Sequence, residues 1–212
     1  MDKLIEKIEK LAEKYSKTLN LKIEERKVEM KEDDTSHYLI YRVLGITNEE
    51  GELIDIYQNK GRFLYKYAGS FLEETATLCF NYKFPNGIKT KIENTEGRRP
   101  KTFEIDFLNE DEAIEIKWRD ATTDGDHITK EHTRVKAIKA KGYKPIRVMF
   151  YYPQREQAKR IQETLKTLYT GVSGMYYAGD EAWDYVKKYT GIDLKNILTE
   201  IADKRIKQNA NE

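Results

Sequence analysis

The 212-residue sequence predicts an α/β (α+β) fold, a mixed sheet flanked by helices, with helix-rich N- and C-terminal ends. Apolar and polar residues alternate in three short segments between residues 88 and 118, which is the period of half-buried strands. Residues 145–152 are almost continuously apolar, which indicates a more deeply buried strand. Most of the remaining chain carries apolar residues at helical spacing.

The N-terminal part of the chain is expected to be helical over residues 1–19, because apolar residues recur there every three or four positions. A polar run follows. Residues 37–46 are apolar and fit either a helix or a strand. Residues 48–51 are expected to form a turn.

A helical period then covers residues 52–82. Gly61 and Gly69 are expected to interrupt it, and Ser70 to begin a fresh helix with a capping box. Pro85 stops this region. Strands and helices are then expected to follow in the order 88–93 (strand), 102–108 (strand), 113–118 (strand), 129–141 (helix), 145–152 (strand) and helices after Pro153.

Length and composition favour one domain over residues 1–212. Its catalytic core is expected at about 68–152, between an N-terminal helical region (1–50) and C-terminal helices (153–212). A single cysteine, Cys79, fits a reducing compartment, and we expect a cytoplasmic protein. The 38 basic and 37 acidic residues give a net charge of +1, which provides no global field that favours nucleic acid, so any DNA binding must rest on local patches.

Residues 103–118 are expected to form a hairpin with a four-residue loop at 109–112. This loop pairs Asp106 with Glu115 and Glu104 with Lys117, and it gathers these four residues on one face. The opposite face is apolar and consists of Phe103, Ile105, Phe107, Ile114, Ile116 and Trp118.

The opposed carboxylates of Asp106 and Glu115 predict a metal site. Like charges at directly opposed strand positions are destabilising. At an effective dielectric of about 20, two such charges roughly 4 Å apart repel by about 4 kcal/mol. A divalent cation turns this repulsion into attraction, and hard oxygen ligands suit Mg²⁺. A solvated sheet face with splayed carboxylates is the alternative that the spacing leaves open.

Lys117 adds a third chemical group, because it lies two residues after Glu115 and therefore on the same side of the strand. An ammonium group beside metal-bound carboxylates can orient a water molecule and offset charge on a phosphate. The preceding helical segment offers a further acidic residue for the site, Glu74 or Glu73. For either residue, an exposed surface position without a catalytic role is an equally good interpretation. The predicted catalytic residues are Asp106, Glu115, Lys117 and Glu74, with Asp106 and Glu115 as the metal ligands.

Residues 120–131 match an EF-hand calcium loop at several positions, including Asp120 and Asp124. The segment before them is an expected strand, where an EF-hand requires a helix. Thr122 and His127 stand where the motif favours other residues. A polar loop that enters a helix and contacts a ligand is therefore the preferred interpretation.

Candidate DNA-contacting side chains lie after the Lys117 strand, before the Asp106 strand and within the helical segment 52–82. They are of the types that contact phosphates and base edges, although each alone is also explained as a solvated charge. They are Arg119, Asp120, Thr122, Asp124, Asp126, His127, Lys130, Arg134, Lys60, Arg62, Arg98 and Arg99.

The runs 115–134 and 58–74 resemble type II restriction endonucleases of the ApaLI-like group, within the PD-(D/E)XK superfamily. The similar region spans roughly residues 55–155, whereas 1–50 and 160–212 have no match. Ile105 stands where the motif has proline. The resemblance implies a restriction-endonuclease-like fold, Mg²⁺-dependent hydrolysis to 5′-phosphate and 3′-hydroxyl ends, and homodimers on a short palindromic site of double-stranded DNA.

We therefore expect a site-specific endonuclease. A structure-specific or repair nuclease of the same fold is one alternative, and it would show little sequence preference. A non-catalytic DNA- or calcium-binding module that binds through residues 119–136 is the other. The complete set of Asp106, Glu115 and Lys117 argues against a silent module.

Overall fold

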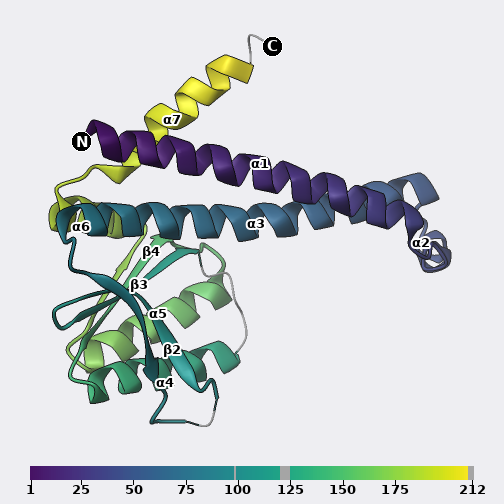
Figure 1. Ribbon diagram of the computed structural model, residues 1–212. Helices are drawn as coiled ribbons and strands as arrows, with labels where there is room; N and C mark the ends of the chain where they lie inside the picture. The colour runs from purple at the N-terminus through teal and green to yellow at the C-terminus, as the bar shows by residue number, and fades with distance from the viewer. Residues whose placement is uncertain (98, 120–124, 210–212) are drawn as a thin grey trace. The chain divides into compact units, whose positions relative to one another are not determined.

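The computed structural model describes residues 1–97, 99–119 and 125–209 (Figure 1). The chain divides into two compact units, and helices α1 (Asp2–Glu32) and α3 (Asn48–Lys83) contribute to both. The first, the sheet unit, consists of Met1–Ile8 and Leu72–Glu212. The second, the helical unit, is Glu9–Phe71. The single domain expected over the whole chain remains a prediction, because this division does not show whether the units fold independently.

The described residues of the sheet unit contain one mixed sheet of five strands in the order β1-β2-β3-β4-β5. The β1–β2 and β2–β3 pairs are antiparallel, and the β3–β4 and β4–β5 pairs are parallel. This confirms the predicted helix-flanked mixed sheet. The strands are β1 (Ile88–Glu93), β2 (Thr102–Asn109), β3 (Glu112–Arg119), β4 (Lys144–Tyr151) and β5 (Met175–Ala178).

Strand β5 shows that the prediction of helices alone after Pro153 was wrong. It has only four residues and lies between Gly174 and Gly179, and glycines within a helical pattern commonly indicate helix breaks. Gly174 is required by packing instead, since a Cβ there would lie 2.4 Å from the carbonyl oxygen of Pro145 at the start of β4. The close approach of β4 and β5 therefore explains this glycine.

Helices cover both faces of the sheet. Helices α4 (Gly125–Ala140) and α5 (Glu156–Gly171) contact each other on one face (Figure 1). Met149 of β4 packs into this layer with residues of both helices. The next residue, Phe150, points to the other face and lies 4.4 Å, ring to ring, from Trp183 of α6 (Asp180–Thr190). Helix α7 (Leu194–Asn209) follows α6 and contacts it.

The helices of the helical unit are longer than predicted. Helix α1 continues to Glu32 instead of ending at residue 19, and α2 (Tyr38–Val43) shows that residues 37–46 contain a helix rather than a strand. The expected turn at 48–51 is the first turn of α3. A capping box begins this helix: the Glu50 amide donates a hydrogen bond to the Thr47 hydroxyl, and the Thr47 amide donates one to the Glu50 carboxylate.

Neither Gly61 nor Gly69 interrupts α3, and Ser70 does not begin a new helix. Side chains of α3 pack along α1 across this stretch, for example Phe63 with Arg26 and Phe71 with Tyr15. Tertiary packing therefore outweighs the low helix propensity of the glycines. Helix α3 ends at Lys83, before Pro85, as predicted.

The predicted hairpin forms with a shorter loop. Phe107 pairs with Ile114 and Leu108 with Ala113, which is the expected register, but Asn109 pairs with Glu112, so the turn is only Glu110 and Asp111. Between Asp106 and the start of β2, the expected pairs with β3 are not formed.

None of the helices among the described residues combines the length and the apolar character of a membrane span.

Candidate active site

Asp106 lies at a β-bulge. The register between β1 and β2 shifts, so that Asp106 and Phe107 stand opposite Lys89 alone. A bulge bends its strand and changes the direction of side chains. As a result Phe107 stacks on Phe80 of α3, whereas Ile105 packs with residues of α4. The single apolar face expected for the hairpin is therefore split between two faces of the sheet, although its β2 members are all buried.

The bulge also opens the ladder between β2 and β3. In place of a backbone pair, Oδ2 of Asp106 accepts the N–H of Ile116 at 2.8 Å. The other oxygen, Oδ1, lies 4.0 Å from Nζ of Lys89. Asp106 is thereby fixed to the backbone between Glu115 and Lys117, at the point where the two strands separate.

Three cationic side chains and one hydroxyl group contact the carboxylate of Glu115. Its Oε1 lies 2.7 Å from a guanidinium nitrogen of Arg134 and 3.3 Å from Nζ of Lys117. Its Oε2 accepts hydrogen bonds from Arg147 at 3.1 Å and from the Tyr169 hydroxyl at 3.0 Å. Burial opposes ionisation, but Arg134, Lys117 and Arg147 outweigh it and hold the pKa of Glu115 below its ordinary value.

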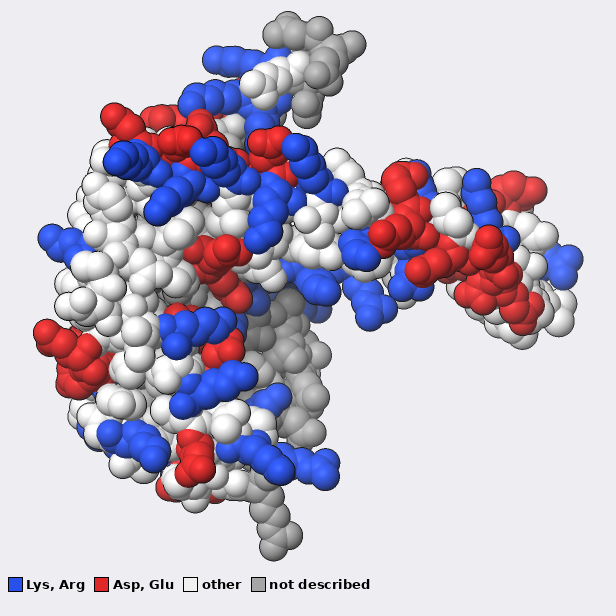
Figure 2. Space-filling view, viewed as in Figure 1, with Lys and Arg blue, Asp and Glu red and all other residues white. Residues whose placement is uncertain are grey.

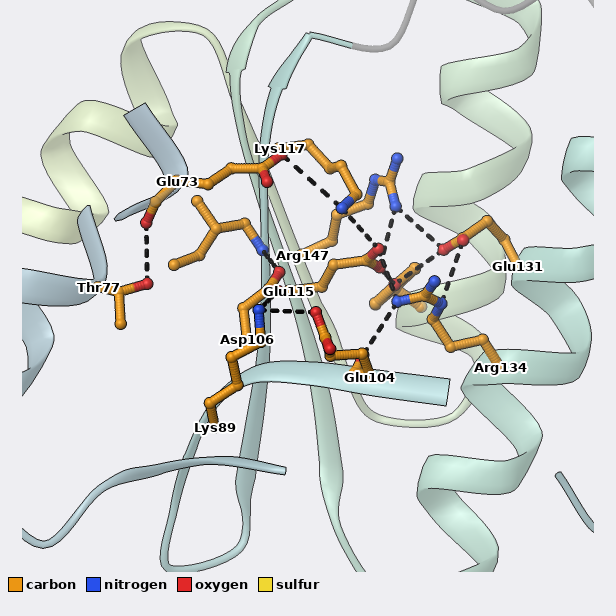
Figure 3. Close-up of polar contacts among 12 residues, drawn as sticks. Glu73, Thr77, Lys89, Glu104, Asp106, Glu115, Lys117, Glu131, Arg134 and Arg147 are labelled. Atoms are coloured by element: carbon orange, nitrogen blue, oxygen red, sulfur yellow. Dashed lines mark hydrogen bonds and ion pairs between the residues drawn. The ribbon is translucent and has the colours of Figure 1, made fainter. Parts of the chain in front are cut away.

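Lys117 lies among carboxylates, as Figure 3 shows. In addition to Glu115, its Nζ lies 3.9 Å from Oε1 of Glu73. Burial disfavours the ammonium form, but Glu115, Asp106 and Glu73 together raise the pKa of Lys117 above its ordinary value. The expected pair between Glu104 and Lys117 does not form, because Glu104 lies 2.7 Å from Lys89 on the neighbouring strand.

Glu73, not Glu74, is the acidic residue of α3 that approaches Lys117. Glu74 is exposed, although it was the predicted third acid. Glu73 is half-buried, and burial together with the nearby Asp106 and Glu115 raises its pKa. The two residues are adjacent in sequence and therefore about 100° apart around the helix, which sequence spacing could not resolve without the orientation of α3.

The pKa of Asp106 is also raised, because burial and the charge of Glu115 outweigh Lys117, the Ile116 amide and Lys89. Ionised Asp106 is therefore less favourable in the folded protein than in the unfolded chain. For a carboxyl group with a raised pKa, stability falls as pH rises from the ordinary value of 3.8 through the folded value.

Asp106→Asn is accordingly expected to raise the melting temperature, and the gain should shrink as pH falls, because protonation removes the charge of wild-type Asp106. The asparagine amide oxygen can still accept the Ile116 N–H. Differential scanning calorimetry of both proteins in EDTA measures the effect. A gain that grows toward low pH would contradict the raised pKa.

A buried ionic network surrounds the carboxylate of Glu115 and fixes its position (Figure 3). Glu131 of α4 contacts Arg134 at 3.2 Å and Arg147 at 3.0 Å, and it accepts a hydrogen bond from Tyr169 at 3.2 Å. Arg147 is completely buried in β4, directly beside Glu115 in the parallel ladder. Two carboxylates and two guanidinium groups balance in charge, as a buried ionic cluster requires.

Sequence reasoning missed Glu131, Arg147 and Tyr169. One signal was present: Arg147 interrupts an otherwise apolar buried strand, and a buried arginine requires acidic partners. The identity of those partners depends on the tertiary packing of α4 and α5. Arg134, a predicted DNA contact, belongs to this network and also lies over the Phe103 ring.

Comparison with protein families decides the assignment. The model of the ApaLI-like restriction endonuclease family matches residues 1–203. The chain belongs to this family. The match includes residues 1–50 and 160–203, which the resemblance of short sequence runs did not cover. No curated protein and no solved structure matches the chain significantly.

As an ApaLI-like restriction endonuclease, the protein is a nuclease whose partner is DNA. On the face seen in Figure 2, basic and acidic side chains are interspersed in small groups, in keeping with the net charge of +1. This face therefore carries no extended surface of basic residues alone.

The predicted DNA contacts belong to different elements of the structure, and some lie outside the described residues. Arg119, at the end of β3, lies over the rings of Trp118 and Tyr151, while Lys130 on α4 and Arg99 before β2 are exposed and His127 is partly exposed. Lys60 and Arg62 lie in the helical unit. The predicted contacts outside the described residues are Arg98, Asp120, Thr122 and Asp124, together with the side chain of Asp126.

The first five residues of the EF-hand-like segment, 120–124, fall in the same gap. The described residues on either side are strand β3 and helix α4, whereas an EF-hand loop lies between two helices. The arrangement of the flanking elements therefore gives no support to a calcium loop.

The carboxylate groups of the candidate site in this ApaLI-like enzyme are of the chemical type that binds a hard divalent cation. Asp106 and Glu73 both have raised pKa values, which a nearby cation would lower. Among the described residues no three His, Cys, Asp or Glu side chains are gathered closely enough to hold a metal ion. The donors at hand are Asp106 and Glu115, and Oε1 of Glu115 is shared with Arg134 and Lys117.

Proposed function

We propose that this restriction endonuclease hydrolyses phosphodiester bonds of double-stranded DNA at a short palindromic site, in a Mg²⁺-dependent reaction. The observation that carries the proposal is the position of Lys117, whose ammonium group lies among Glu73, Asp106 and Glu115. The protein acts as a cytoplasmic homodimer, since cutting both strands at a symmetric site requires two active sites.

Asp106 and Glu115 would hold the Mg²⁺ ion through their carboxylate groups. The bound ion would supply Lewis-acid polarisation of the phosphate and a lowered pKa for a coordinated water. The Ile116 amide fixes the orientation of Asp106, and Arg147 and Tyr169 fix that of Glu115. This support limits side-chain motion of the carboxylates, which is what a precise catalytic geometry requires.

Lys117 orients the attacking water and offsets negative charge that develops on the phosphate as the P–O3′ bond breaks. The raised pKa of Lys117 keeps its ammonium group charged at neutral pH. Glu73 neutralises this charge in part and aligns the side chain from the opposite side. We assign Glu73 this positioning role in place of the role predicted for Glu74.

DNA contacts are proposed for the polar residues after β3 and for the basic residues before β2. The described candidates are Arg119 at the end of β3, His127 and Lys130 on α4, and Arg99 before β2. Arg134 is withdrawn from this set because Glu115 and Glu131 bind its guanidinium group. Family membership favours sequence-specific cutting over a repair or structure-specific nuclease.

Lys117→Ala is expected to reduce the rate of DNA cleavage at least about 10²–10³-fold while leaving DNA affinity within a few-fold of wild type. The ammonium group acts on the reacting phosphate and contributes little to the sequence-independent contacts that dominate affinity. Single-turnover cleavage with Mg²⁺ measures the first effect. Gel-shift titration in EDTA measures the second.

Lys91→Ala is the matched control, because Lys91 is an exposed lysine of β1, which is separated from the Lys117 strand by β2. It should cleave at nearly the wild-type rate. Equal activity of Lys117→Ala and Lys91→Ala would refute a catalytic role for Lys117. Equal loss of binding and cleavage in Lys117→Ala would indicate a DNA contact instead.

A further inference from the structure

The first half of α3 has two apolar sides, and only one of them packs against α1. Phe63 and Tyr67 contact Arg26 and Tyr15 of α1 within the helical unit, where Figure 1 shows the two helices side by side. A second apolar stripe lies on another side of the helix. It consists of Ile54, Tyr57, Gly61 and Leu64, and we call it the α3 stripe.

The α3 stripe is exposed to an unusual degree for large apolar residues. The exposed fraction is 52% for Ile54, 66% for Tyr57 and 49% for Leu64. A Cβ built on Gly61 would meet no atom within 4 Å, so this position also faces open space. Contiguous exposed apolar surface of this kind marks an interaction site.

The spacing of the stripe is that of a helix-pairing surface. Its members recur at intervals of three, four and three residues, which is the spacing of core positions in a coiled coil. Glycine disfavours a helix interior, and nothing within the described part of the chain requires it at position 61. A helix that packs closely across the stripe would require it, since a small residue allows a large side chain to enter.

We propose that the α3 stripe pairs with the α3 stripe of a second copy of this chain, antiparallel and about a two-fold axis. In this arrangement Ile54 packs against Leu64 of the second copy, and Tyr57 against Gly61 of the second copy. Each contact occurs twice, as two-fold symmetry requires. The bulky Tyr57 thus meets the smallest residue of the stripe.

The charges of α3 favour the antiparallel direction. The acidic residues Glu49, Glu50 and Glu52 lie in the first turns, and the basic residues Lys60, Arg62 and Lys66 lie further along the helix. Antiparallel pairing brings the acidic turns of one copy toward the basic segment of the other. Parallel pairing would place like charges side by side, which is destabilising.

The apolar area is sufficient for a stable dimer. Helix α2 packs on a neighbouring side of α3 through Tyr41 and Asp55, and α2 together with its C-cap residue adds four more exposed apolar side chains. Together with the stripe and Leu53, these residues would bury on the order of 600–900 Å² per copy. A standard interface buries about 800 Å² per partner. The additional residues are Leu39, Ile40, Val43 and Leu44.

This pairing would supply the second active site that the proposed double-strand cut requires, and that connection rests on the proposed function. The pairing itself is measured without DNA. Failure of the dimer therefore leaves the cleavage assay untouched, and failure of cleavage leaves the sedimentation result untouched.

The test is a pair of oppositely charged variants examined by sedimentation equilibrium at micromolar concentration. Ile54→Lys and Leu64→Glu are each expected to weaken the wild-type dimer at least about 100-fold, because each buries two unpaired charges. Mixing the two variants should restore dimers, since the lysine introduced in one chain then lies beside the glutamate introduced in the other. Gly61→Ala, which meets no atom within its own chain, should also weaken the dimer.

Leu21→Glu is the control, because Leu21 is a similarly exposed apolar residue of α1 outside the stripe. It should sediment as wild type, and circular dichroism should show that all variants are folded. A monomeric wild type would overturn the proposal and leave the stripe to another partner. A dimer that survives both stripe variants would place the interface elsewhere, and a mixture that stays monomeric would contradict the antiparallel register.

Discussion

Asp106→Asn is expected to lower the rate of DNA cleavage by about 10³-fold or more without unfolding the protein. The substitution removes one negative charge from the proposed metal site, and loss of metal-assisted catalysis removes several kcal/mol of transition-state stabilisation. Asparagine retains an oxygen that can accept the Ile116 N–H, so the bulge should persist. Single-turnover cleavage with saturating Mg²⁺ measures the change.

The matched control is Asp111→Asn, in the turn of the same hairpin and exposed to solvent. It should retain nearly full activity. Partial recovery of Asp106→Asn at high Mg²⁺ or with Mn²⁺ would support a ligand role for Asp106. A variant as active as wild type would contradict the assignment of Asp106 to the active site.

Arg147→Met is expected to lower the free energy of unfolding by about 3–5 kcal/mol, the typical result of breaking a buried ion pair. Arg147 is completely buried, and its removal leaves Glu115 and Glu131 with insufficient positive charge. Urea unfolding at pH 7.5 measures the effect. The loss should shrink as pH falls, because protonation neutralises the two carboxyl groups that lack partners.

Two further variants separate this explanation from a simple loss of packing. Adding Glu131→Gln to Arg147→Met should recover part of the stability, because it removes one uncompensated charge. Arg160→Met is the surface control, since the Arg160–Glu156 pair on α5 is 75% exposed on both sides and should contribute under about 1 kcal/mol. Equal losses for Arg147→Met and Arg160→Met would rule out the network as a major source of stability.

The hairpin shows what local pattern can establish. Alternation predicted the strands and their register near the turn, because shifting the register by one residue would reverse every side chain. The bulge at Asp106 was beyond this reasoning, since it depends on how β1 pairs with β2. It is also the feature that brings Asp106 to the backbone between Glu115 and Lys117.

The helices show a different limit. Gly61 and Gly69 predicted interruptions in α3 from local propensity, but packing on α1 keeps the helix continuous. Glu73 could not be distinguished from Glu74 without knowing how α3 is rotated about its own axis relative to the sheet. Arg147 carried a readable signal in the sequence, whereas its partners Glu131 and Tyr169 come from separate helices and required the tertiary structure.

We propose that this ApaLI-like endonuclease cuts DNA at the site formed by Asp106, Glu115 and Lys117. The most direct test of this claim is incubation of the purified protein with plasmid DNA and Mg²⁺, with EDTA and Asp106→Asn as controls, followed by gel electrophoresis. Discrete bands that disappear in both controls are the predicted result. Discrete bands that persist with Asp106→Asn, or intact plasmid with the wild-type protein at every Mg²⁺ concentration, would contradict the claim.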